Sequence, residues 1–165
     1  MIAARLQALP AVQAAEKLYG CATALLERYG APLFDLAVRL WIARVFFNSG
    51  RVKIADWNST VYLFQDEYKV PILPPEVAAT IGAAFELGMP VFLVLGLCAR
   101  FAALPLIGMT LVIQFVLGAR DPSYDNVEHF YWLFLLVMIV VRGPGVFSLD
   151  WLLRRSFTAA RLISK

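Results

Sequence analysis

A single carboxylate, Glu86, lies in the middle of residues 77–98, an otherwise apolar stretch that is long enough to cross a bilayer. A transmembrane helix needs about 20 predominantly apolar residues. A charged side chain at the centre of such a helix costs roughly 2.5 to 3.5 kcal/mol on insertion scales. Glu86 must therefore find a cation, stay protonated or face water inside the protein.

The composition favours a membrane protein over a soluble one. Hydrophobic residues make up 61% of the 165 residues and charged residues only 16%, whereas soluble domains are about 45–50% apolar. A soluble fold of this size has too little interior to bury that much apolar surface. Basic residues do not cluster with stacking aromatics, so no nucleic-acid partner is expected. One histidine and two distant cysteines give no pattern for a metal site.

Four apolar stretches predict four membrane-spanning helices, at about residues 33–49, 77–98, 101–118 and 127–141. Helices are expected because lipid leaves every backbone group to be satisfied internally, and the alternation of a barrel strand is absent. The fold class predicted is therefore an all-α bundle of four transmembrane helices. Basic residues gather on the side that holds the two ends of the chain, which places both termini in the cytoplasm.

The regions outside the spans predict further helices. Residues 1–30 alternate apolar and charged side chains and form an expected amphipathic arm before the membrane domain, residues 31–151. Residues 152–165 form a basic cytoplasmic tail. In the first outer loop, Asn58, Ser59 or Thr60 is expected to cap a short interfacial helix. That helix is either a lid over the outer mouth of the bundle or a plain connector.

Two arginines in the first span offer partners for Glu86. A rise of 1.5 Å per residue places Arg39, Arg44 and Glu86 within a few ångströms of one depth. The arginines are about 140° apart around the helix, so only one of them faces the second span. The other is expected to turn to Asp35, to a carbonyl or to the outer cavity. The pair with Glu86 is either a structural cross-link or part of a ligand site.

Other polar residues collect toward the outer half of the predicted bundle. A cavity in a helical bundle is built from such inward polar groups on several helices. Each also has a plainer interpretation, in which His129 is a solvated histidine and Gln114 an interhelical hydrogen bond. The candidates for a ligand pocket are Arg39, Arg44, Asn48, Lys53, Glu86, Gln114, His129 and Trp132.

Residues across 32–151 resemble the DoxX family of small bacterial membrane proteins with four helices. The closing segment, residues 143–150, is the most specific part of the resemblance. The other residues that match in order are Arg39, Phe46, Gly50 and Lys53 in the first span, and Glu86, Gly88, Gly96 and Arg100 in and after the second.

The resemblance implies a modest set of functions. One family member is a small subunit of a thiosulfate:quinone oxidoreductase, and others are tied to membrane complexes that handle oxidative or thiol stress. We therefore expect an accessory subunit of a membrane redox or stress-response system, whose pocket takes a quinone head group or a small polar substrate. Whether the chain itself catalyses a reaction stays open.

Two alternative functions also stay open. Residues 67–71 and 73–76, together with His129 and Trp132, resemble a subgroup of the family that often accompanies peptide-modifying, copper-responsive genes. This resemblance suggests a helper for transport of a peptide or metal-peptide product. The other alternative is a non-catalytic scaffold. The expected partners are the lipid bilayer, a membrane or periplasmic subunit, and a second copy of the chain.

Overall fold

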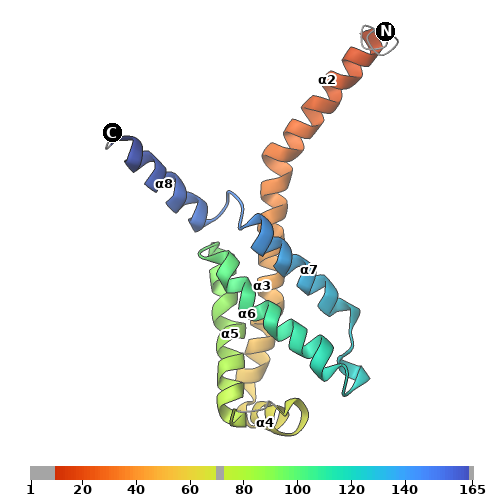
Figure 1. Cartoon of the computed structure of the whole chain (residues 1–165), viewed down its shortest axis with the longest axis vertical. Coiled ribbons are helices and arrows are strands. Elements are labelled where there is room, and N and C mark those ends of the chain that lie inside the picture. Colours follow the sequence, from red (N-terminus) through yellow and green to blue (C-terminus); the bar gives the residue numbers. More distant parts are fainter. Residues whose placement is uncertain (1–9, 70–72, 164–165) are drawn as a thin grey trace. The chain divides into compact units, whose positions relative to one another are not determined.

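The computed structural model describes residues 10–69 and 73–163, and the chain divides into two compact units, Met1–Phe34 and Asp35–Lys165. The described residues form helices, turns and connecting loops and contain no strand (Figure 1). The all-α class predicted from the sequence is therefore confirmed for this part of the chain.

The first unit is a continuous run of helix. α2, Pro10–Leu25, passes into a π-helical turn, η1, Leu26–Gly30, and then into the next helix. Proline suits the first position of a helix because its missing N–H would have no partner there. No side chain of α2 is buried. The predicted amphipathic arm also covers residues 1–9, which lie outside the described residues.

The second unit holds the remaining helices. α3, Ala31–Ala55, begins in the first unit and runs into the second. The elements that follow are α4 (Trp57–Tyr62), η2 (Leu63–Tyr68), α5 (Pro75–Leu95), α6 (Ala99–Leu111), η3 (Val112–Leu117), η4 (Pro122–Tyr124), α7 (Val127–Arg142) and α8 (Leu149–Ile163). η2 and η3 are π-helical continuations of α4 and α6, and η4 is a short 3₁₀ turn.

Helices lie over all four ranges that were predicted to span the bilayer. In the part of the chain that the structure describes, two helices are long and apolar enough to cross a membrane, Pro75–Leu95 and Ala99–Leu117. α7 has 16 residues, which is a length of about 24 Å, and α3 carries several charged side chains. The four-span arrangement therefore stays a prediction.

Four helices supply the core of the second unit. Ala99, Ala102 and Ala103 on α6 are buried, and such small residues let neighbouring helices approach closely. A smaller cluster packs η2 against α5 through Phe64, Ala78 and Ala79. The other members of the main core are Val38, Ile42, Ala43 and Phe46 of α3, Leu93 of α5, Leu106 of α6, and Leu136 and Ile139 of α7.

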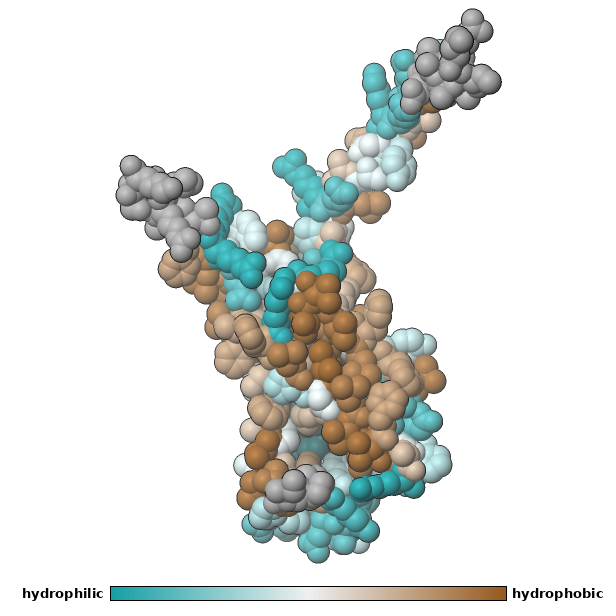
Figure 2. Space-filling view, in the orientation of Figure 1, coloured by the Kyte–Doolittle hydropathy of each residue, from teal (hydrophilic) through white to brown (hydrophobic). Residues whose placement is uncertain are grey.

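Large apolar side chains remain exposed along α6, η3 and α7. Phe101, Leu104, Phe115, Phe134 and Val141 are all at least half exposed. Figure 2 shows this apolar surface as a brown band along the helices, with polar residues gathered at the end where α4 lies. A continuous exposed apolar surface of this kind marks contact with a membrane or a protein partner.

Candidate functional site

Glu86 forms an ion pair with Lys53, so the expected pairing with Arg39 or Arg44 is wrong. Lys53 Nζ lies 2.9 Å from Oε1 and 2.8 Å from Oε2 of Glu86. Glu86 is only 2% exposed. Among the described residues, its Oε2 has no donor that satisfies hydrogen-bond geometry. The carboxylate is therefore neutralised by a cation but keeps an oxygen that can accept a further hydrogen bond.

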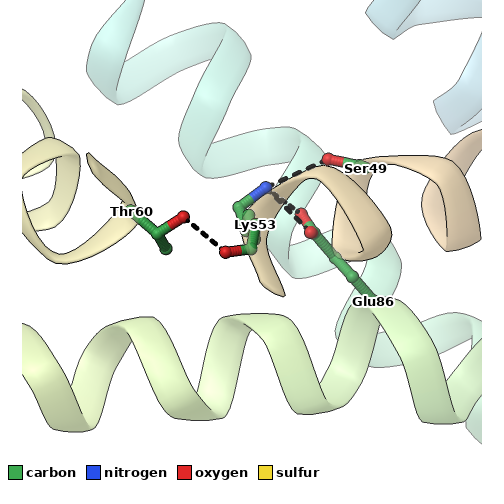
Figure 3. A network of polar contacts seen from close by, with 4 residues as sticks. All are labelled: Ser49, Lys53, Thr60 and Glu86. Atoms are coloured by element: carbon green, nitrogen blue, oxygen red, sulfur yellow. Dashed lines mark hydrogen bonds and ion pairs between the residues drawn. The ribbon is translucent and has the colours of Figure 1, made fainter. Parts of the chain in front are cut away.

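Neighbouring helices hold Lys53 in place (Figure 3). Its ammonium donates to Ser49 Oγ, 3.0 Å away and one turn earlier on α3. Its backbone carbonyl accepts from Thr60 Oγ1 of α4 at 2.8 Å. The carbonyls at the end of a helix lack intrahelical partners, so Thr60 satisfies one of them and ties α4 to the end of α3.

The register between α3 and α5 explains why Lys53 is the partner. α3 continues beyond the predicted end of the first span, so Lys53 lies inside the helix. A Cβ on Gly50 would lie 2.8 Å from Leu87 Cγ and 3.0 Å from Glu86 Cβ, which puts Gly50 level with Glu86. Arg39 is about 16 Å from Gly50 along the helix axis, too far to reach the carboxylate.

Arg39 is fully buried and binds carbonyl groups at the other end of α5. Nη1 donates to the Leu93 carbonyl at 3.1 Å and to the next carbonyl at 3.4 Å, and Nη2 donates to the Phe147 carbonyl. Asp35, the other expected partner of Arg39, lies 3.3 Å from Arg142 Nε. Arg39 therefore caps α5 and joins α3 to the segment after α7.

The closing segment, residues 143–150, packs on the turn that ends α5. Gly96 ends this helix with a φ of +64°, and a Cβ there would collide with Arg39 Nη1 and with Ser148. Glycine is the residue that adopts this left-handed conformation without strain. The close packing of the closing segment depends on that missing side chain.

Two residues of the closing segment cap two different helices. Ser148 Oγ accepts from the Trp151 N–H at 3.2 Å and so caps α8. Asp150 accepts from the Cys98 N–H at 2.8 Å and from the Ala99 N–H at 3.3 Å, which caps α6. Both contacts satisfy N–H groups that have no partner inside their own helices.

A cavity of about 500 Å³ lies between α5, α6, η3 and η2, with the Lys53–Glu86 pair in its wall. Small-molecule pockets in proteins measure roughly 300–1,000 Å³. Tyr68 and Arg120 are the other polar side chains in the lining. The remaining walls are apolar or glycine, and include Ile81, Phe85, Met109, Val112, Ile113 and Val116.

η2, which continues α4, lines one side of this cavity through Phe64 and Tyr68. The N-cap of α4 is Asp56 rather than any residue expected to cap this helix, and its carboxylate accepts from the Ser59 N–H at 3.0 Å. Hydrogen bonds from the hydroxyl and the N–H of Ser59 lower the pKa of Asp56. A Cβ added at Gly82 would lie 3.0 Å from Cζ of the Phe64 ring on η2. Gly82 thus lets η2 pack closely on α5.

Two hydrogen bonds tie η2 to the connection between η3 and α7. The Tyr124 hydroxyl donates to the Glu67 carboxylate, and Arg120 Nη1 donates to the Tyr68 carbonyl at 3.4 Å. The hydrogen bond to Glu67 raises the pKa of Tyr124. Burial, together with the carboxylates of Glu86 and Glu67, raises the pKa of Tyr68 to about 12. Both phenols are therefore neutral near pH 7.

Gln114, His129 and Trp132 form a separate polar chain that joins η3 to α7. Gln114 Nε2 donates to Asp125 Oδ1 at 2.5 Å, and Gln114 Oε1 lies 2.8 Å from His129 Nδ1. Because the amide oxygen faces the ring, Nδ1 carries the hydrogen. The rings of His129 and Trp132 meet edge to face with centroids 4.9 Å apart. These contacts support the interhelical role for Gln114.

Arg44 and Asn48 lie at a third site, separate from the cavity and from the Gln114–His129 contacts. They line a groove of about 400 Å³ between α3 and α5. Both side chains are exposed. The groove lies outside the lining of the cavity that holds Lys53 and Glu86.

The predicted pocket residues are thus divided among separate places, and only Lys53 and Glu86 line the larger cavity. Sequence reasoning missed Tyr68 and Arg120 as lining residues, because their positions depend on how the outer loops fold back. The pairing of Lys53 with Glu86 had a signal in the sequence. Residues 46, 50 and 53 follow helical spacing, which indicates that α3 continues past the predicted end of the first span and includes Lys53.

Comparisons with known proteins identify the family of this chain. The chain is 28% identical over 141 residues to an uncharacterized protein of Haemophilus influenzae, an alignment that covers 80% of this chain and 91% of the relative. No solved structure matches the chain. A family model described as DoxX matches residues 34–119, from α3 to the end of η3. This match spans just over half of the sequence, and the chain therefore belongs to the DoxX family of membrane proteins.

Proposed function

We propose that this DoxX protein crosses the bacterial inner membrane four times, through α3, α5, α6–η3 and α7, with both termini in the cytoplasm. Two of these helices have the length and composition of membrane spans, and exposed apolar side chains continue onto α7. The positive-inside rule supports the orientation. The basic residues on the proposed cytoplasmic side are Arg5, Lys17, Arg28, Arg100, Arg142, Arg154, Arg155, Arg161 and Lys165.

Within this arrangement, the cavity at Lys53 and Glu86 is the ligand site. The observation that carries this proposal is the combination of apolar walls with one buried ion pair. Such a lining suits an amphiphile, because ring or chain atoms contact the walls while a few polar groups fix its orientation. Lys53 supplies N–H donors, and Glu86 Oε2 has accepting capacity.

A quinone has the chemistry that this cavity fits. One quinone carbonyl would accept from the Lys53 ammonium in place of Ser49 Oγ, and a hydroxyl of the reduced quinol would donate to Glu86 Oε2. The ring and isoprenoid chain would contact apolar walls such as Phe85 and Met109. A doubly charged anion such as thiosulfate would lose its hydration against these walls, which is costly. We therefore propose an accessory membrane subunit of a redox or stress-response system that binds the quinone for its partner.

Binding of a short-chain ubiquinone by the purified protein in nanodiscs tests this proposal. Calorimetry or tryptophan quenching would compare wild type with Glu86→Gln and Lys53→Gln, which nearly keep the side-chain lengths but remove the ion pair. The expected result is at least about tenfold weaker binding in both variants, equivalent to about 1.4 kcal/mol. Arg44→Leu, outside the cavity, is the matched control and should bind as wild type does. If wild type and both cavity variants bind equally, or none binds while all remain folded, the quinone site is refuted.

A further inference from the structure

Arg44 differs from Arg39 and Lys53, two of the three other cations in α3. Arg39 is bonded to carbonyls and Lys53 to Glu86. Within residues 10–69 and 73–163, Arg44 makes no hydrogen bond or ion pair, and its side chain is exposed. A cation without a partner on a membrane helix requires an explanation.

The surroundings of Arg44 are apolar. It lines the groove between α3 and α5 together with Asn48, one turn further along the same face of the helix. Phe47 is 40% exposed and Val91 49% exposed in the same groove. The groove therefore presents an open apolar surface with one cation and one amide in it.

The depth of the groove makes this cation costly. Pro90 lines the groove and lies about 7–8 Å before the end of α5 at Leu95. In the four-span arrangement proposed above, on which this inference rests, Arg44 would face hydrocarbon. An arginine at the centre of a span costs roughly 2.5 to 3.5 kcal/mol on insertion scales, and the cost is smaller toward the end of the span.

We propose that this groove receives a transmembrane helix of a partner protein, and that the partner helix carries an aspartate or glutamate paired with Arg44. Charge complementarity selects this occupant. A carboxylate accepts two N–H bonds from a guanidinium in one plane, and Asn48 offers a further donor beside it. Exposed apolar residues of the groove then contact the apolar face of the partner helix.

Two other occupants fit the charges less well. A second copy related by twofold symmetry would bring the same patch together and place Arg44 beside Arg44. A lipid phosphate would lie near the Leu95 end of the groove, whereas Pro90 lies about 7–8 Å deeper along α5. Both occupants are outcomes that the experiment can reveal.

The test uses three model peptides with the full-length protein in phosphatidylcholine vesicles. Each peptide is an apolar leucine–alanine transmembrane helix with one Glu, Gln or Lys at the depth of Arg44, and binding is read by energy transfer. Wild type should bind the Glu peptide at least tenfold more tightly than the Gln peptide. Arg44→Leu should lose this preference, and Arg44→Glu should prefer the Lys peptide. Arg51→Leu, an exposed arginine of α3 outside the groove, should behave as wild type.

Equal binding of the Glu and Gln peptides, or a preference that survives Arg44→Leu, would overturn the proposal. Stabilisation by phosphatidylglycerol that depends on Arg44, without a peptide preference, would instead identify a lipid phosphate. Association between labelled copies that Arg44→Leu abolishes would identify a second copy. Identification of a lipid phosphate or of a second copy would also overturn the proposal of a partner helix.

Failure of the groove can be separated from failure of the membrane arrangement. In a background without the native cysteines, Arg44→Cys should resist a membrane-impermeant maleimide in vesicles. Labelling from water would overturn both the arrangement and the groove. Protection from labelling without a Glu preference would overturn the groove alone. Quinone binding should be unchanged by Arg44→Leu, because Arg44 lies outside the lining of the cavity.

Discussion

Arg39 is a buried cation and Lys53 a half-buried one on the same helix, and their surroundings differ. Arg39 gives its donors to backbone carbonyls from α5 and from the closing segment, and it is 0% exposed. Lys53 pairs with one carboxylate at the wall of a cavity. One region is closed and built from backbone partners, and the other is open and built from side chains.

This difference separates architecture from ligand binding. A guanidinium held by carbonyl groups cannot exchange them for a ligand without breaking the cap of α5. Glu86 Oε2 and Arg39 Nε both lack a hydrogen-bond partner among the described residues, but only the Lys53–Glu86 pair lines the cavity. We therefore assign stability to the Arg39 region and propose ligand binding for the Lys53 region, and variants in each should affect different measurements.

The largest loss of stability is expected for Arg39→Leu. It removes the Arg39 donors from three carbonyls, of which Leu93 keeps the Gly96 N–H. Each carbonyl left without a donor costs about 1–3 kcal/mol, and we expect a total loss of about 3–5 kcal/mol. SDS-induced unfolding in detergent micelles measures this free energy. Arg44→Leu is the matched control on the same helix and should change it by less than about 0.5 kcal/mol. Similar losses in both variants would remove the contrast between a capping arginine and an exposed one.

Lys53→Met should cost about 3 kcal/mol, because Glu86 is then buried without a cation. Adding Glu86→Leu should recover most of this loss and bring the free energy of unfolding within about 1 kcal/mol of wild type. The same unfolding assay provides the measurement. A double variant that is as unstable as the single one would show that the pair is required for folding, against its assignment to ligand binding.

Gly96→Ala should destabilise the Arg39 region by about 2 kcal/mol. The left-handed backbone costs roughly 1–2 kcal/mol for alanine, and the new methyl group collides with Arg39 and Ser148. Gly88→Ala is the control, because its Cβ would meet nothing within 4 Å. Alanine there should stabilise the helix by about 0.5–1 kcal/mol. Thermal unfolding of the two variants should therefore shift in opposite directions, and shifts of the same sign would contradict the packing of the closing segment.

The smallest effect is a titration near the Lys53 region. Burial and nearby carboxylates raise the pKa of Tyr68 to about 12 from an ordinary value of 10.0. The stabilisation linked to this shift is present below pH 10 and is lost as the pH rises through 12. The difference in ultraviolet absorbance between wild type and Tyr68→Phe should show no phenolate signal from this residue at pH 10.5. A clear signal at that pH would mean that the α4–η2 segment does not bury the phenol.

Local sequence pattern accounts for much of the fold. Apolar stretches predicted helices at the positions of α5, α6 and α7, and the closing segment indicated the DoxX family, which is confirmed by a match to residues 34–119. The depth of Glu86 also predicted that it needs a cation, a proton or internal water, and the structure supplies a cation. These conclusions depend on composition and spacing within single segments.

The identity of that cation required the three-dimensional structure. Gly50 sets how closely α3 approaches α5, and the length of α3 sets which residue faces Glu86. One acceptor for Arg39 is the backbone carbonyl of Phe147, which is far away along the chain. Contacts of this kind depend on register between helices, which periodicity in one helix does not report.

Filling the cavity tests the central claim most directly. Gly108 lines the cavity, and a Cβ there would meet nothing within 4 Å, so Gly108→Leu should place its side chain in the space without disturbing the fold. Gly88→Leu also enters open space, but Gly88 is not part of the lining. We predict that Gly108→Leu binds a short-chain ubiquinone at least tenfold more weakly than wild type, while Gly88→Leu binds it normally and both variants are at least as stable as wild type. Unchanged quinone binding by a folded Gly108→Leu protein would contradict the assignment of this cavity as the ligand site.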